Sequence, residues 1–307
     1  MIERYATGAV VVVAALASPG GAQQRHVPMA PATPAERTAR AAVVHAGYRH
    51  DDLLWENDLT AHRIYGRALE AVEPPSGSGI DAWGKRVAWP FMDRQLRTGD
   101  QHADHGEGID FYNVGGGRGA GGLGIWHDNK LWVSRNYARY RIHDAGPRIA
   151  EFSVDYAPWP VDVGRTVRET RRFTLPAGTH FTRMVSTLSS NRPGALIVGI
   201  GISKRPIAPT LSGSLVKEAA TGRMSWWGPT DPAKGTMAVA ILVDPQALVG
   251  FVEDADNYLA LVRVTPGRPF VYYMGAAWDR GGGVTSADAW RRLVAAQRPS
   301  FAVPPAV

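Results

Sequence analysis

The densest group of chemically reactive side chains lies between Asp100 and Tyr112 of this 307-residue sequence. In that stretch His102 and His105 alternate with carboxylates, and the glycine-rich run 115–122 follows closely. Glycine lets a backbone approach a ligand, and such loops commonly carry function when a rigid scaffold holds their ends. We therefore expect this stretch to line the floor of a cleft, together with tryptophan and arginine side chains.

Three kinds of chemistry fit these residues. A zinc or calcium site is one, because alternate side chains of an extended segment converge on one side. A glycosidase is another, with Glu107 and Asp110 or Asp104 as acid and nucleophile, although such close neighbours rarely lie across a sugar ring. In the third, His105 is a general base whose tautomer Glu107 or Asp104 holds. The metal ligands would be His102, Asp104, His105 and Glu107.

Aromatic side chains form a second signal, because ten tryptophans are more than a core of this size requires. Sugar rings stack on indole faces through their C–H groups, so surplus tryptophan near polar loops indicates carbohydrate. The leading candidates are Trp83, Trp126 and Trp278, each beside a His, Asp or Arg, with His127 next to Trp126.

The charge balance favours an acidic ligand. Thirty-four basic residues against 28 acidic ones give a net charge of +6, and the excess is arginine. A guanidinium matches carboxylate geometry, although a GC-rich genome would also enrich arginine. No dense basic block or RNA-binding signature is present, so we expect no nucleic-acid partner. Tyr137, close to Arg135, is a candidate proton donor.

Several site classes are excluded. The chain has no cysteine, which rules out disulfides, thiol nucleophiles and iron–sulfur clusters. The glycine run precedes a β-hairpin rather than a helix, so it is not a nucleotide fingerprint. No Gly-x-Ser-x-Gly elbow is present. No cofactor is predicted, and a divalent metal stays open.

The first residues predict export. Arg4 precedes an apolar run, Ala6 to Ala17, and small residues follow, so we read 1–22 as a signal peptide. The mature protein would be periplasmic or secreted, with no membrane association after cleavage. Residues 23–42 read as an Ala/Pro-rich linker, and 43–307 as one β-sandwich domain.

Short β-branched and aromatic runs separated by Gly, Pro, Asn or Asp predict an antiparallel all-β domain. Asp128-Asn129 and Thr221-Gly222 would turn two hairpins. One helix is expected at the end, capped by Ser286 and packed through Trp290, Leu293 and Val294. The result would be a large antiparallel β-sandwich of two sheets with a C-terminal helix. The main predicted strands are 124–127, 130–134, 150–156, 167–175, 181–188, 196–202, 215–218, 223–227, 237–243, 258–264 and 270–274.

Six motifs in a fixed order resemble an exported bacterial family known only as a domain of unknown function. The resemblance implies an extracytoplasmic setting and, from the genes that accompany such members, uronate-containing glycans such as pectin as the substrate class. It implies no catalytic residues. The motifs are Trp55-Glu56-Asn57-Asp58, Tyr65-Gly66, Ser78 to Trp83, His102 to Tyr112, Gly121 to Trp126 and Tyr272 to Trp278.

Together these observations favour a carbohydrate-active enzyme, a lyase or dehydratase that acts on uronic-acid oligosaccharides by β-elimination. Elimination needs a cation on the carboxylate, a base for the C5 proton and an acid for the departing oxygen. We expect His105 as base and Glu107 as its orienter. The clamp would be Arg118 or Arg135, the acid Tyr137 or Tyr112, and further substrate contacts would come from His102, Asp104, Asp110, Trp126, His127, Trp83 and Trp278.

Two alternatives remain open at this level. One is a glycoside hydrolase that pairs Glu107 with a distant carboxylate, Asp81 or Asp279. The other is a non-catalytic periplasmic sugar-binding protein. The sequence does not indicate an oligomeric state.

Overall fold

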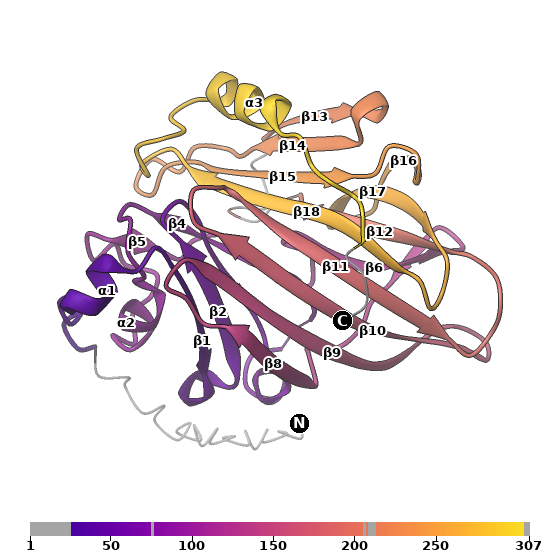
Figure 1. Ribbon diagram of the computed structural model, residues 1–307, viewed down its shortest axis with the longest axis horizontal. Helices are drawn as coiled ribbons and strands as arrows, with labels where there is room; N and C mark the ends of the chain where they lie inside the picture. The colour runs from indigo at the N-terminus through magenta and orange to yellow at the C-terminus, as the bar shows by residue number, and fades with distance from the viewer. Residues whose placement is uncertain (1–25, 75–76, 205–206, 208–212, 304–307) are drawn as a thin grey trace, which may run out of the picture.

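The computed structural model describes residues 26–74, 77–204, 207 and 213–303, and within them three antiparallel sheets (Figure 1). The N-terminal sheet has the order β1 (Ala41–Ala46), β2 (Asp52–Asn57), β3 (Ala61–Ile64), β4 (Asp81–Lys85), β5 (Gly108–Ile109). The large sheet has the order β13 (Ser214–Glu218), β14 (Arg223–Trp227), β15 (Met237–Val243), β18 (Pro269–Trp278), β11 (Phe181–Ser190), β10 (Arg165–Pro176), β9 (Ile149–Asp162), β8 (Arg139–Asp144). The third sheet has the order β16 (Leu248–Glu253), β17 (Asn257–Val264), β12 (Leu196–Ser203), β6 (Ala120–His127), β7 (Lys130–Trp132).

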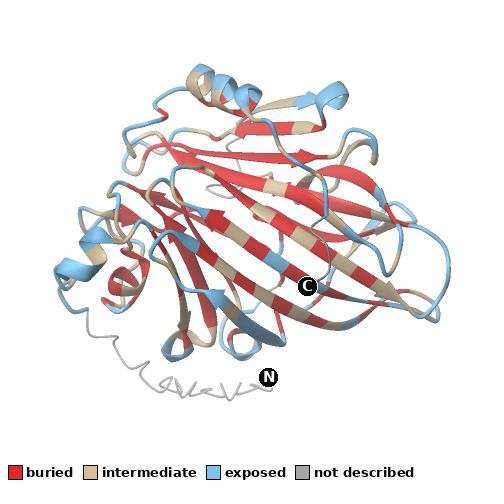
Figure 2. Ribbon diagram, in the orientation of Figure 1, coloured by how far each residue is buried: buried red, intermediate tan, exposed pale blue. Residues whose placement is uncertain are grey.

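Both smaller sheets pack on the same face of the large sheet. Buried and exposed residues alternate along β9 and β10, which is the period-two pattern of strands with one dry face (Figure 2). Trp55 of the N-terminal sheet packs against Phe152 and Phe173 on that dry face. Farther along the same face, β15 and β18 contact β6 of the third sheet. One apolar core therefore runs through all three sheets.

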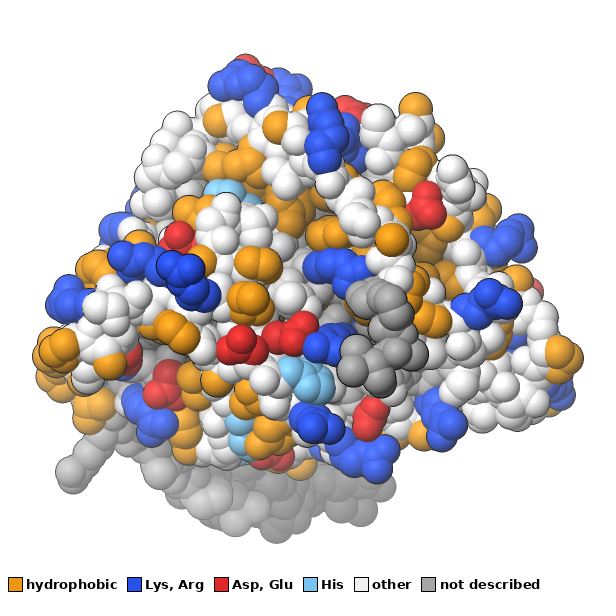
Figure 3. Space-filling view, in the orientation of Figure 1, with side chains coloured by type: hydrophobic (Ala, Val, Ile, Leu, Met, Phe, Trp, Pro, Cys, Tyr) orange, Lys and Arg blue, Asp and Glu red, His pale blue; other side chains and the backbone are white. Residues whose placement is uncertain are grey.

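The outer face of the large sheet carries the polar halves of these strands. Basic and acidic side chains are interspersed on it (Figure 3). Arg172 of β10, for example, pairs with Glu151 of β9 through two hydrogen bonds of 3.0 and 2.8 Å. Such exposed pairs contribute little stability each, so on β9 and β10 the outer face serves mainly to keep the sheet solvated.

The two smaller sheets are joined at a seam, which we define as the parallel bridge between Ile80 and Gly119. Gly119 has a φ of +60°, and a Cβ there would lie 1.8 Å from the carbonyl oxygen of Ile80. Only glycine fits this position, for backbone conformation and for space.

The predicted C-terminal helix is confirmed as α3 (Ala287–Ala296). The Ser286 side chain accepts a hydrogen bond from the Ala289 amide, and Trp290 and Val294 are buried against β14 and β15. Two five-residue helices, α1 (Pro34–Thr38) and α2 (Met92–Leu96), were not predicted. α1 lies within the segment expected to be a linker, where Thr33 and Glu36 form a capping box.

The all-β sandwich class and the predicted strands from β6 onward are confirmed, whereas β8 and β16 were not predicted. The inner layer differs from the expectation of two sheets, because the N-terminal strands form a sheet of their own beside the third sheet. The predicted signal peptide lies outside the described residues. Within the described part of the chain, no helix has the length and apolar character needed to cross a bilayer.

Candidate functional site

A cleft of about 990 Å³ opens beside β3 and β4 of the N-terminal sheet. Its walls come from the turn after β1 (residues 48–50), the segment from β3 to residue 74 together with residue 77, the loop before β5 (residues 96–102) and the extended segment after β5 (residues 110–115). We call this space the cleft. The polar residues in its lining are Tyr48, Arg49, His50, Arg63, Tyr65, Glu73, Asp81, Gln101, His102, Asp110, Tyr112, Asn113 and Lys234.

Arg63 is the centre of the polar wall of the cleft. Its Nη2 donates to Asp81 Oδ2 at 2.7 Å and to Asp110 Oδ2 at 2.8 Å. Its Nη1 lies 3.5 Å from Asp52 Oδ2, and all four side chains are at most 6% exposed. The indole of Trp83 stacks against the guanidinium and donates to Asp81 at 3.0 Å. We call Arg63, Asp52, Asp81 and Asp110 the Arg63 cluster.

Three buried carboxylates share one guanidinium in this cluster, which disfavours the ionised forms of Asp52 and Asp110. Burial raises the pKa of Asp110 well above its usual range, and the neighbouring Asp81 raises it further. Burial also raises the pKa of Asp52 to about 7, although Arg63 opposes this. Asp52 Oδ1 has no hydrogen-bond partner among the described residues. The cluster therefore holds at least one proton near neutral pH.

His102 stands at the edge of this cluster with a defined tautomer. Its Nδ1 lies 2.9 Å from the main-chain oxygen of Asp110, and a carbonyl can only accept, so Nδ1 carries the proton. The lone pair is then on Nε2, which is 3.2 Å from the Gln101 amide nitrogen. The side chain is 61% exposed, and its Nδ1 is 3.8 Å from Asp110 Oδ2. The Gln101 amide can donate to this lone pair, so a ligand in the cleft reaches Nε2 by displacing the Gln101 contact.

Two further cleft residues, Tyr65 and Lys234, have terminal polar atoms that make no hydrogen bond or ion pair with a described residue. Tyr65 lies over the Arg63 guanidinium, and its hydroxyl makes no hydrogen bond with a described residue. Burial and the nearby Asp81 raise the pKa of Tyr65, so the phenol keeps its proton. The Lys234 ammonium makes no ion pair with a described residue, whereas Arg49 pairs with Glu73 at 2.6 Å.

The loop that holds most of the predicted site is divided by the structure. His102 and Asp110 line the cleft, whereas Asp104, His105 and Glu107 are outside its lining. His105 Nε2 donates to the Asp100 carbonyl at 2.9 Å. Glu107 accepts hydrogen bonds from Arg94 and from the Trp89 indole, so the orienting contact expected for it is absent among the contacts of the described residues. Asp104 forms a two-bond pair with Arg86, which lowers its pKa.

The predicted proton donors and clamps lie elsewhere. Tyr112 lines the cleft but is 1% exposed and donates to the Gly119 carbonyl at 3.0 Å. Tyr137 donates to the Asp51 carbonyl at 2.5 Å, outside the cleft. Arg118 is buried between the sheets, and Arg135 is exposed and paired with Glu70. None of these four presents a free polar atom to the cleft.

Of the predicted aromatic contacts, Trp83 lies behind the cleft wall in contact with the Arg63 cluster. The Trp278 indole donates to the Lys234 carbonyl at 2.8 Å, next to the cleft. Trp126 and His127 lie on β6, and His127 Nε2 is 3.4 Å from Asp128, away from the cleft. Of the alternative hydrolase pair, Asp81 is in the cluster whereas Glu107 is outside the cleft.

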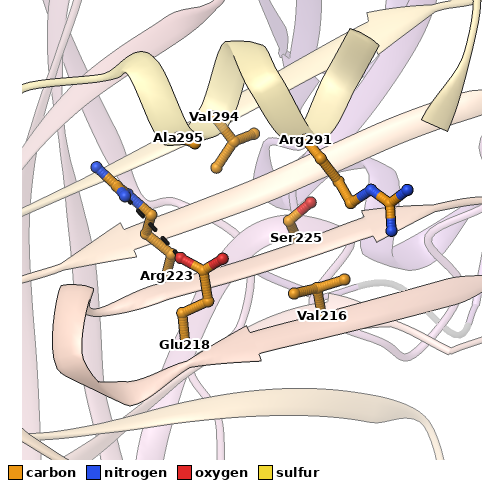
Figure 4. Close-up of a pocket in the computed structure, with 7 residues that line it drawn as sticks. All are labelled: Val216, Glu218, Arg223, Ser225, Arg291, Val294 and Ala295. Carbon is orange, nitrogen blue, oxygen red and sulfur yellow. Dashed lines mark ion pairs between the residues drawn. The ribbon is translucent and has the colours of Figure 1, made fainter. Parts of the chain in front are cut away.

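Other cavities are smaller or apolar. The pocket between α3 and the β13–β14 hairpin has room for about 20 Å³, roughly one water (Figure 4). In the described residues, no three His, Asp or Glu side chains are arranged to hold a metal ion.

Arg63, Tyr65, Asp52 and Lys234 were missed as site residues. A signal for Arg63 existed, because an arginine in the strand Ala61-His62-Arg63-Ile64 must be buried or must line a cavity. Lys234 comes from a distant turn, and nothing in its local sequence marks it.

A family model described as "Domain of unknown function (DUF4861)" matches residues 9–307. An uncharacterized protein, P7 of Formosa agariphila, is 29% identical over 262 residues, which cover 80% of this chain and 64% of that protein. This chain therefore spans less than two thirds of that relative.

Among solved structures, the GH36 alpha-galactosidase AgaA from Geobacillus stearothermophilus aligns with a TM-score of 0.34 and 10% identity, over 76% of this chain and 42% of that chain. The alpha-galactosidase from Lactobacillus brevis aligns with a TM-score of 0.30 and 9% identity, over 81% of this chain and 42% of that chain. At these TM-scores neither likeness bears on activity.

Proposed function

We propose, from the premise that this chain belongs to the DUF4861 family, that it is an extracytoplasmic carbohydrate-active enzyme that cleaves uronate-containing oligosaccharides by β-elimination in the cleft. The observation that carries the proposal is the tautomer of His102. A histidine whose Nδ1 proton is held by a main-chain carbonyl offers an unprotonated Nε2 as base. The same cleft is lined by Tyr65 and Lys234, whose terminal polar atoms make no hydrogen bond or ion pair with a described residue.

Each group has a step in the elimination. Lys234 binds the uronate carboxylate and makes the C5 proton more acidic. His102 Nε2 takes that proton, and its electron pair forms the C4–C5 double bond as the C4–O bond breaks. The Tyr65 hydroxyl protonates the departing oxygen. One chain becomes two, one with an unsaturated end and one with a new hydroxyl, so atoms balance without water.

The size of the cleft supports an oligosaccharide. The cleft volume of about 990 Å³ is at the upper end of the range for small-molecule sites. The surface that lines the cleft is more polar than apolar. Lys234, Arg49 and Arg63 bring three cations to it. The Arg63 charge is matched by carboxylates of its own cluster and the Arg49 charge by Glu73, so among the described lining residues Lys234 is the cation left to recognise a bound acid.

The test compares two histidines of one loop. With oligogalacturonides and other uronate oligosaccharides as substrates, His102→Ala should lower the rate of unsaturated-uronate formation at least about a hundredfold. His105→Ala, the matched control, should stay within about threefold of the parent rate, because His105 is outside the cleft. Tyr65→Phe, which removes only a hydroxyl, should lower kcat with little change in KM.

Product analysis by ultraviolet absorbance and mass separates the alternatives. The unsaturated product of elimination is one water lighter than the product of hydrolysis. Saturated products would favour a hydrolase, and binding without turnover would favour a sugar-binding protein. Either result overturns the proposal, as does an equal loss of rate in His102→Ala and His105→Ala.

A further inference from the structure

A second polar cluster is buried inside the sandwich, away from the cleft. Glu169 and Arg171 of β10 face inward and form two hydrogen bonds of 2.7 and 2.8 Å, with both side chains 0% exposed. Ser186 of β11 donates to the same carboxylate. This pair is neutral, because one guanidinium is matched by one carboxylate.

Arg118 adds an unmatched positive charge from the opposite side. It precedes β6 of the third sheet and is 1% exposed. Among the described residues its guanidinium donates to neutral oxygens alone, to Ser78 Oγ at 3.1 Å and to the Gly116 carbonyl at 3.2 Å. Gly201 of β12 makes room for it, since a Cβ there would lie 2.7 Å from the Arg118 Cβ. Buried charges are normally paired, so this arrangement is costly as it stands.

Three donors in this region have no hydrogen-bond partner among the described residues, namely Arg118 Nε, Arg171 Nη1 and the Tyr156 hydroxyl. Tyr156 is 3% exposed, and its ring is 5.1 Å from the Arg171 guanidinium. Burial and the repulsion of Arg171 lower the pKa of Arg118 to about 10, whereas Tyr156, Asp254 and Asp256 act in the opposite direction. All three orphaned groups are donors, and the formal charge of the two arginines and Glu169 is +1.

We propose that this cluster is a structural binding site for a small monovalent anion of the halide class, held by Arg118, Arg171 and Tyr156. An anion supplies both the missing acceptor and the missing negative charge, whereas a water molecule supplies only the acceptor. Every donor is enclosed by packed side chains of the core, so the ion must be small and fully dehydrated. Its role is to hold the third sheet against the large sheet. The site is independent of the elimination chemistry.

The test uses the purified full chain in chloride-free sodium gluconate, with sodium chloride or bromide replacing gluconate at constant ionic strength. A specific site should raise Tm along a saturable curve, as expected when a ligand binds only the folded state. Bromide in crystals should appear by anomalous scattering beside Arg118. The same Tm throughout the exchange, with no bromide peak, would show that water satisfies these donors and would overturn the proposal.

Variants locate the effect. Tyr156→Phe removes one hydroxyl and should raise the halide concentration of half-effect about tenfold. Arg118→Met should abolish the saturable response, and the matched control is Arg172→Met on the outer face of β10, which should keep it. If Arg118→Met does not fold, the Tyr156→Phe shift decides alone. An unchanged midpoint in Tyr156→Phe contradicts the proposed ligand set.

Discussion

At the scale of single residues, the Arg63 cluster combines binding chemistry with a cost in stability. Three carboxylates converge on one guanidinium, so the cation cannot satisfy all of them in ionised form. The main-chain oxygen of Asp110, which fixes the His102 tautomer, belongs to a residue that the cluster holds in place. The cluster therefore acts on the proposed base as a positioning device.

Asp52 gives a pH test of this cost. Its pKa rises from an ordinary 3.8 to about 7 in the folded protein, so the folded state binds a proton more tightly than the unfolded chain. Its contribution to stability is therefore full below the ordinary pKa and falls as pH rises toward 7. Asp52→Asn, which stays neutral, should raise Tm by about 2–4 °C at about pH 8 and by less at about pH 5.

Thermal melts of both proteins across this pH range measure the effect. Asp128→Asn is a suitable control, because the Asp128 side chain is 87% exposed in the turn after β6, away from the cleft. If Asp52→Asn is less stable than the parent at every pH, the attraction between the Asp52 carboxylate and Arg63 exceeds the free-energy cost of burying that carboxylate.

At the scale of elements, the capping signal in the sequence and the tertiary packing both favour a helix at α3. Ser286 caps the first turn, Asp288 lies in that turn, and Trp290 is stacked on Phe181 of β11. The helix covers apolar side chains of the large sheet that would otherwise face water.

Ser286→Ala should lower the free energy of unfolding by about 1 kcal/mol, because the Ala289 amide loses its acceptor. Chemical denaturation with a matched Ser300→Ala control, on the exposed segment after the helix, measures the difference. A difference within error would mean that packing of Trp290 alone fixes the helix.

The sequence was most informative where a pattern is local. The alternation in β9 and β10, the Asp128-Asn129 turn with φ values of 49° and 55°, and the α3 cap could all be predicted. The short strands β2 to β5 could not, because they are buried throughout and lack alternation. The cleft combines residues far apart in the chain, such as Arg63 and Lys234, and only the tertiary fold brings them together.

At the scale of the whole molecule, three sheets share one core, with Trp55 of the N-terminal sheet against Phe152 and Phe173 of the large sheet. We expect one cooperative unfolding transition, in which tryptophan fluorescence and far-ultraviolet circular dichroism coincide. Two separated transitions would show that the N-terminal sheet is an independent folding unit.

The seam at Ile80 and Gly119 also has a consequence for how a ligand is received. Asp81 follows Ile80 directly, and the Tyr112 hydroxyl is bonded to the Gly119 carbonyl, so two residues of the cleft are anchored at the junction of the two smaller sheets. A receptor built in this way is preorganised. Under the proposed function, such a cleft would bind a matching sugar chain at little entropic cost and would discriminate by shape against chains that require its floor to move.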